Sequence, residues 1–217
     1  MSIATHLTAT GIALALAAGS ALARQPQFEL PQVSPKPNET PVRGATTNLY
    51  GQFLSFLPPA WAVRDAAGNR KQGRSTFLLE FVPKAEGFEE WTKLFGLKAR
   101  QSAQHTVAAE AAEIEQLFRN GCDPRRTVLL RSGYNGVPVP PDGGVLFTIF
   151  CGAFRNDDAR GEIAVMRVMK RADVTVRLYQ EWRGASFDPA DRESHPAPAA
   201  EVAAANRRLS RARFVRQ

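Results

Sequence analysis

The stretch from residue 162 to residue 182 reads EIAVMRVMKRADVTVRLYQEW and contains two β-strands with a short polar connection between them. Apolar and polar residues alternate along the second strand, which is the pattern of a strand with one buried face and one wetter face. The buried face is predicted to carry Val174, Val176, Leu178 and Trp182, and the wetter face Thr175, Arg177, Tyr179 and Glu181. Because only residues 170–173 separate the strands, they are predicted to form an antiparallel hairpin.

Further elements are predicted on both sides of this hairpin. Apolar alternation predicts strands at 52–56, 76–82 and 145–151. Helices are predicted at 106–120, with Thr106 as N-cap, and at 199–213. Residues 89–99 fit a helix or a strand, and we assign a short helix because Trp91, Leu94 and Phe95 share a helical stripe. The predicted class is α+β, an antiparallel β-sheet of about 5–6 strands covered by two or three helices.

The N-terminal region has the pattern of an exported protein. Residues 12–23 form an apolar run that ends in Ala21-Leu22-Ala23, a small-x-small site for cleavage before Arg24. The alternative is an uncleaved anchor, although the run is shorter than the ~20 residues of a membrane-spanning helix. Residues 24–48 contain five prolines and suit an extended tether. We therefore predict a signal peptide (1–23), a Pro-rich tether (24–48) and a single domain (49–217) in a periplasmic or secreted protein.

The chain has two cysteines, Cys122 and Cys151. In an oxidising compartment such a pair forms a disulfide more often than two free thiols. A metal site is the competing interpretation, but after the predicted cleavage site only His105 and His195 are available, and no Cys-x-x-Cys spacing exists. We expect a disulfide, with no metal and no cofactor.

The charge balance indicates the kind of partner. The chain has 28 Lys and Arg against 21 Asp and Glu, a formal net charge of +7, which favours phospholipid head groups, acidic polysaccharide or an acidic protein face over nucleic acid. The predicted C-terminal helix ends in a group of arginines that suits contacts with phosphate or carboxylate: Arg207, Arg208, Arg211 and Arg213. Trp61 follows a Pro-Pro pair and is the tryptophan expected to line a groove, whereas Trp91 and Trp182 are expected in the core.

No group of residues matches a known active site. His105, near Ser102, is a candidate general base, and the competing interpretation is a surface histidine at a helix cap. His195 is expected to lie in solvent. The acidic residues Asp142, Asp157 and Asp158 are expected to form turns rather than a cation site.

Three functions remain open from the sequence. The leading hypothesis is a non-catalytic binding or accessory protein of the cell envelope that contacts an anionic partner. The first alternative is an envelope hydrolase, which requires a cleft that holds His105 against a serine or a carboxylate. The second is a subunit of an export or conjugation apparatus, which requires a stable stoichiometric partner.

Two short motifs carry a resemblance to known proteins. The motifs Glu80-Phe81-Val82-Pro83 and Glu89-Glu90-Trp91-Thr92 resemble a strand-proline-loop-tryptophan-threonine pattern in a group of uncharacterised exported proteobacterial proteins. The resemblance continues through the cysteine region to residues 179–183. More remotely, the order of elements is similar to the PsbP/Mog1-like sandwich, which DcrB-like proteins share. That resemblance implies binding or accessory roles and supplies no catalytic residues.

Overall fold

A computed structural model describes residues 27–29, 44–131 and 143–216 of the chain. The predicted signal peptide (1–23), residues 30–43 of the predicted tether and Asp142 lie outside the described residues. Strand β1 and all of β2 except Leu49 lie within the range 24–48 that was expected to be a tether. In the part of the chain that is described, no helix is long and apolar enough to cross a membrane.

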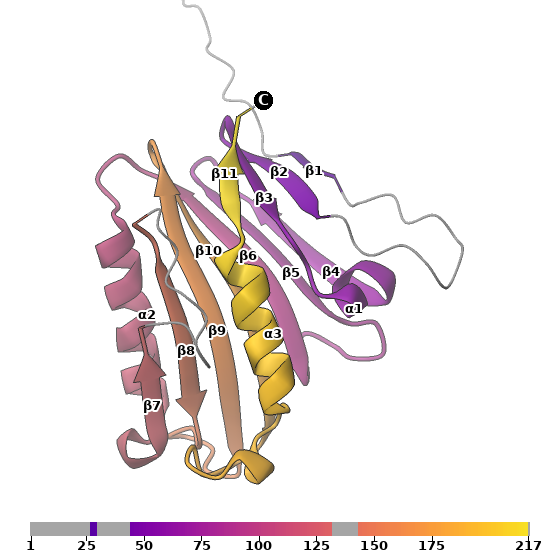
Figure 1. The fold of residues 1–217 in the computed structure, drawn as a ribbon, viewed down its shortest axis with the longest axis vertical. Coiled ribbons are helices and arrows are strands. Elements are labelled where there is room, and N and C mark those ends of the chain that lie inside the picture. The colour runs from indigo at the N-terminus through magenta and orange to yellow at the C-terminus, as the bar shows by residue number, and fades with distance from the viewer. Residues whose placement is uncertain (1–26, 30–43, 132–142, 217) are drawn as a thin grey trace, which may run out of the picture.

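The described residues form two antiparallel sheets and three α-helices (Figure 1). The larger sheet has seven strands in the order β4-β5-β6-β10-β9-β8-β7, and the smaller has four in the order β1-β2-β3-β11. The strands are β1 (Gln27–Glu29), β2 (Ala45–Leu49), β3 (Gln52–Phe56), β4 (Ala66–Gln72), β5 (Thr76–Pro83), β6 (Lys93–Gln101), β7 (Thr127–Leu130), β8 (Val145–Cys151), β9 (Arg160–Arg171), β10 (Val174–Ala185) and β11 (Arg213–Val215). The helices are α1 (Ala60–Arg64), α2 (Val107–Gly121) and α3 (Ala199–Ser210), with short 3₁₀ turns at Pro124–Arg126 and Arg192–Ser194. The α+β class is confirmed, with more strands than expected and a second sheet.

The predicted hairpin forms the centre of the large sheet. β9 and β10 pair antiparallel over their whole length, from Val174 opposite Arg171 to Ala185 opposite Arg160. Ala172 closes the turn with a positive φ of 51°. Both strands lie inside the sheet, with β6 beside β10 and β8 beside β9.

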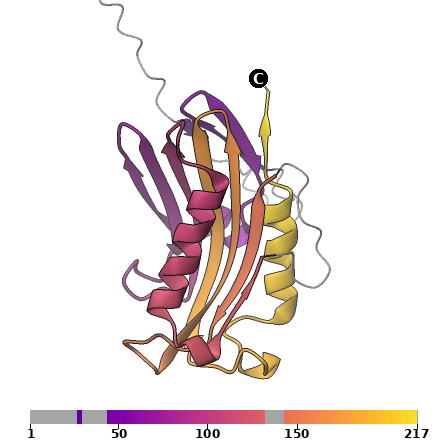
Figure 2. The ribbon, with the colours of Figure 1, turned by 90° about the vertical axis from the view of Figure 1, so that its left-hand side faces the viewer.

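The large sheet is covered on both faces (Figures 1 and 2). On one face α3 and the small sheet enclose a core that includes Phe95, Trp182 and Leu209. On the opposite face α2 encloses a second core, because Ala111, Ile114 and Phe118 are spaced three and four residues apart and share one side of the helix. Thr106 caps α2 as predicted, its side chain accepting a hydrogen bond from the Ala109 amide at 3.0 Å.

The prediction of a wetter second face is wrong for β10. Thr175 and Tyr179 point to that face and are only 2 % and 7 % exposed. On the same face of the neighbouring strands β5 and β6, Leu78, Glu80 and Lys98 are partly exposed. The polar pattern of β10 therefore reflects a face that is only partly covered.

The assignment of 89–99 as a short helix is also wrong. Residues Lys93–Gln101 form β6, which pairs with β5 and β10. Because both faces of this central strand carry apolar residues, its sequence does not alternate cleanly and resembles a helical stripe. The C-terminal helix likewise ends at Ser210 rather than at residue 213, and β11 follows it.

The two cysteines form the predicted disulfide, with their Cα atoms 5.6 Å apart. Cys122 is the C-cap of α2, and Cys151 ends β8, opposite Thr127 of β7. The bond therefore joins the C-terminal end of α2 to the edge region of the large sheet.

Replacing both cysteines by serine is expected to lower the free energy of unfolding by about 3–4 kcal/mol, because a loop of this length loses its covalent closure. Urea denaturation without reductant measures the change. Dithiothreitol should destabilise the parent and leave the Cys122→Ser/Cys151→Ser variant unchanged. Equal midpoints for parent and variant would show that the disulfide does not stabilise the fold.

Candidate functional site

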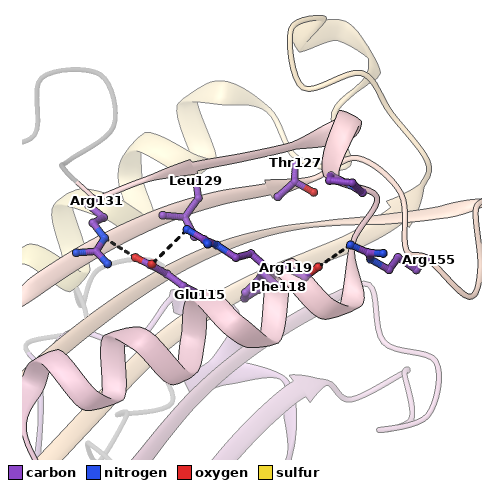
Figure 3. A pocket seen from close by; sticks show the side chains of 8 residues that line it. Glu115, Phe118, Arg119, Thr127, Leu129, Arg131 and Arg155 are labelled. Carbon is purple, nitrogen blue, oxygen red and sulfur yellow. Dashed lines mark hydrogen bonds and ion pairs between the residues drawn. The ribbon is translucent and has the colours of Figure 1, made fainter.

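A groove opens between α2 and β7, the last strand of the large sheet within the described residues (Figure 3). Its volume is about 820 Å³, a size typical of pockets that hold small organic ligands. Apolar side chains and arginines line it together: Glu115, Phe118, Arg119, Pro124, Thr127, Leu129, Arg131 and Arg155. The groove thus offers an apolar floor and a positively charged rim.

The periodicities of helix and strand bring the lining residues together. Glu115, Phe118 and Arg119 are three and four residues apart and so share the side of α2 that borders the groove. Thr127 and Leu129 are two residues apart on β7 and point to the same face of the sheet. Phe118 is buried and Leu129 packs against the same core, so these two residues form the floor.

Arg155 closes the groove at the C-terminal end of α2. Its Nε donates to the carbonyl of Cys122 at 2.9 Å, and its Nη2 donates to the carbonyl of Arg119 at 3.0 Å. These carbonyls lie where a helix leaves acceptors without intrahelical donors and where its dipole favours a cation. Arg155 is therefore held in place by the helix end.

Glu115 lies between two arginines of the rim. It accepts a hydrogen bond from Nε of Arg131, and one of its oxygens lies 3.9 Å from Nη2 of Arg119. The hydrogen bond from Arg131 is the main reason that the pKa of Glu115 lies below its usual value. The Arg119 and Arg131 side chains are 77 % and 61 % exposed, against 13 % for Glu115. Two accessible guanidinium groups therefore share one carboxylate.

The C-terminal arginines lie on a different surface from this groove. They belong to α3 and the residues after it, on the opposite side of the large sheet from α2 (Figure 2). Arg207, Arg211 and Arg213 are exposed. Arg208 instead donates to Oε1 of Gln180 on β10, and burial lowers its pKa. The structure thus separates Arg208, which packs inward, from its three neighbours.

Trp61 lies on α1, where it is half-buried and packs against the core beneath α3. Its indole Nε1 is buried and makes no hydrogen bond with the described residues. Trp61 does not line the groove between α2 and β7. Trp182 is fully buried and Trp91 is 7 % exposed, as expected for core residues.

His105 is part of an ion-pair network rather than exposed at a helix cap. Its Nε2 lies 2.7 Å from the buried carboxylate of Glu110, and its Nδ1 lies 3.2 Å from Nη1 of Arg100. Because the guanidinium only donates, Nδ1 must accept and Nε2 must carry the proton. Both ring nitrogens are thus engaged, while Ser102 contacts only the backbone amide of His105. The carboxylate expected for a hydrolase is present, but the ring has no nitrogen free to accept a proton from a nucleophile.

The same network brings three possible metal ligands together. Atoms of His105, Glu110 and Glu113 lie within 4.8 Å of one another. Arg100 holds Glu113 through two hydrogen bonds of 3.1 and 3.2 Å, and Arg177 pairs with Glu110 at 2.5 Å. Burial would raise the pKa of Glu110, but Arg177 and the other neighbours lower it below its ordinary value. Arg100 and Arg177 therefore already supply the positive charge that a metal ion would bring to Glu110 and Glu113.

The remaining sequence candidates have structural contacts. His195, expected in solvent, packs against Phe150 and Phe187 with ring centres 5.2 and 5.1 Å apart. Asp157 pairs with Arg160 three residues later at 2.5 Å, as in a local turn. Neither residue contributes to the groove.

A pair of glutamates on β9 and β10 was not predicted. Glu162 is 6 % exposed and accepts from Nη2 of Arg183 at 2.9 Å, while the Arg183 guanidinium stacks 3.9 Å from the Trp91 ring centre. Burial raises the pKa of Glu181 well above its ordinary value, and the charge of Glu162 raises it further. Burial also raises the pKa of Glu162, but Arg183 opposes that shift through its charge and its hydrogen bond.

No family model matches this chain, and no curated protein matches its sequence. The geometry of the described residues therefore carries the functional argument.

The raised pKa of Glu181 makes stability depend on pH. Below its ordinary pKa the carboxyl is protonated in both the folded and the unfolded chain, and its contribution is fully present; stability is then lost as pH rises through the raised folded pKa. Glu181→Gln is expected to flatten this loss and to raise the melting temperature at pH 8 relative to the parent. Melting curves between pH 4 and pH 8 test this, with the exposed Glu89→Gln as control. A variant that melts below the parent at pH 8 would contradict the raised pKa of Glu181.

Proposed function

We propose that the protein is an exported, non-catalytic binding or accessory module of the cell envelope, and that the groove between α2 and β7 takes an anionic partner. The observation that carries this proposal is the pair of exposed arginines, Arg119 and Arg131, which share the single carboxylate of Glu115 above an apolar floor. A partner with a negatively charged head and an apolar portion complements both parts of the groove.

The charge of the rim favours an anion for a physical reason. A guanidinium group presents five N–H donors in a planar fork, and Glu115 engages only part of those of Arg119 and Arg131. Phosphate and carboxylate oxygens match the remaining donors, and such charge-assisted hydrogen bonds are stronger than neutral ones. The net charge of +7 supports attraction of the same partner over longer distances.

Two further features support export and an accessory role. The disulfide between Cys122 and Cys151 suits an oxidising compartment, where such bonds persist. Helices on both faces of an antiparallel sheet are compatible with the PsbP/Mog1-like sandwich that the sequence resembles, and we include that relationship in the proposal. Fold likeness alone names no partner.

The alternatives are less well supported by the described contacts. The hydrolase hypothesis needs a ring nitrogen of His105 as base, and Arg100 occupies Nδ1. The C-terminal arginines Arg207, Arg211 and Arg213 remain a second possible anion-binding surface, without an apolar floor among the contacts described. A subunit of an export or conjugation apparatus would use either surface for a protein partner.

Dodecyl phosphate, below its micellar concentration, tests the groove as a probe with an anionic head and an apolar tail. Arg119→Ala/Arg131→Ala is expected to weaken binding at least about tenfold in isothermal titration calorimetry, because each lost charged hydrogen bond is worth roughly 1.5–3 kcal/mol. The matched control Arg207→Ala/Arg211→Ala removes the same charge from α3 and should leave the affinity unchanged.

The uncharged probe dodecyl maltoside separates head-group recognition from apolar adsorption. The parent should bind it more weakly than dodecyl phosphate, and the groove variant should bind both probes alike. If the α3 variant loses affinity and the groove variant keeps it, the binding site is on the C-terminal surface and the groove proposal is wrong.

A further inference from the structure

A second pocket lies on the large sheet where α2 does not cover it. It has a volume of about 550 Å³ and is bordered by β5, β6 and β10 together with the β4–β5 turn. Its lining includes Lys71, Thr76, Leu78, Glu80, Lys98 and Tyr179. The described lining of this pocket has no residue in common with the groove between α2 and β7.

Tyr179 forms a fixed aromatic floor. It lies directly opposite Gly96, where a Cβ atom would come within 2.2 Å of the phenol ring, so the ring lies over the glycine. Its hydroxyl reaches across to donate to Oε1 of Glu80 at 2.7 Å. Burial and the charge of Glu80 raise the pKa of Tyr179, which keeps it a neutral donor. Tyr179 is only 7 % exposed, so the part of it that lines the pocket is held rigidly by Gly96 and Glu80.

Lys98 is a half-buried cation near the charges of Glu110 and Glu113, but it has no hydrogen-bonded or ion-paired partner among the described residues. It lies opposite Leu78 on one side and opposite Arg177 on the other. Arg177 is paired with Glu110 and Arg100 with Glu113, whereas Lys98 makes no hydrogen bond or ion pair with any described residue. Burial lowers the pKa of Lys98 and the charge of Arg177 lowers it further, while the charges of Glu110 and Glu113 offset part of this shift.

This arrangement costs stability unless something pairs with Lys98. Like charges directly opposite each other on neighbouring strands destabilise a sheet, and partial burial of an unpaired cation adds to that cost. Residues that reduce stability in this way often serve a binding site. Exposed Lys71 adds a second positive charge at the rim, and Glu80 repels anions from the far end of the pocket.

We propose that this pocket is a second ligand site, for a small organic monocarboxylate. Lys98 pairs with the carboxylate, and the planar or apolar body of the ligand covers Tyr179 and Leu78. A monoanion is favoured because Lys98 is the half-buried cation of the pocket, Lys71 lies exposed at its rim, and Glu80 opposes a second negative group. The site is independent of the proposed function, since it uses none of the groove residues.

The probe for this site is 2-naphthoate, with 2-naphthamide as its uncharged isostere. Titrations followed by ¹H–¹⁵N NMR should shift the amides of Gly96 and Lys98 with naphthoate, and the affinity for naphthamide should be at least tenfold lower. Lys98→Met should reduce naphthoate affinity at least tenfold, while the exposed Lys84→Met, which removes the same charge, leaves it unchanged.

The melting temperature of Lys98→Met distinguishes a ligand-binding role of Lys98 from a structural one. Lys98→Met should melt at or above the temperature of the parent, because it removes an unpaired cation. Equal binding of naphthoate and naphthamide, unchanged affinity in Lys98→Met, or no amide shift at Gly96 and Lys98 would each overturn the proposal. Arg119→Ala/Arg131→Ala should bind naphthoate like the parent, so failure at one site does not imply failure at the other.

Discussion

The disulfide between Cys122 and Cys151 is the constraint on which the candidate site depends. Helix α2 rests on the sheet through one narrow apolar stripe, and the bond fixes its C-terminal end to β8 beside β7. Arg155 reinforces the same end by donating to two carbonyls of the helix terminus. The separation of α2 and β7, and with it the groove, follows from this anchored end. An oxidising compartment would thus be a condition for the site as well as for stability.

On the face of the sheet that carries α2, some positive charges are paired one to one with a carboxylate and others are not. Near the start of α2, Arg100 and Arg177 are each matched with a glutamate. At the rim of the groove two arginines share one carboxylate, and in the second pocket Lys98 has no described partner. On this face, the groove and the second pocket therefore each hold positive charge in excess of its described partners, where an anionic ligand can reach it.

The sequence predicted those parts of the fold that depend on residues close together along the chain. The hairpin of β9 and β10, helix α2 with its Thr106 cap, and the cysteine pair were all predictable. Strand β6 was not, because a central strand with apolar residues on both faces loses its alternation. The groove was missed because Arg119 and Arg131 belong to separate elements that only the tertiary structure brings to Glu115. The C-terminal arginines were predicted to bind an anionic partner because they are close together in sequence, although Arg208 packs inward onto Gln180.

The position of a bound anionic amphiphile tests the central claim most directly. A crystal structure of the protein with 12-bromododecyl phosphate would locate the tail by the anomalous signal of bromine. The account predicts the phosphate within hydrogen-bonding distance of Arg119 and Arg131, with the tail over Phe118 and Leu129. Density for the phosphate at Arg207 and Arg211 instead, with the groove between α2 and β7 empty, would contradict it.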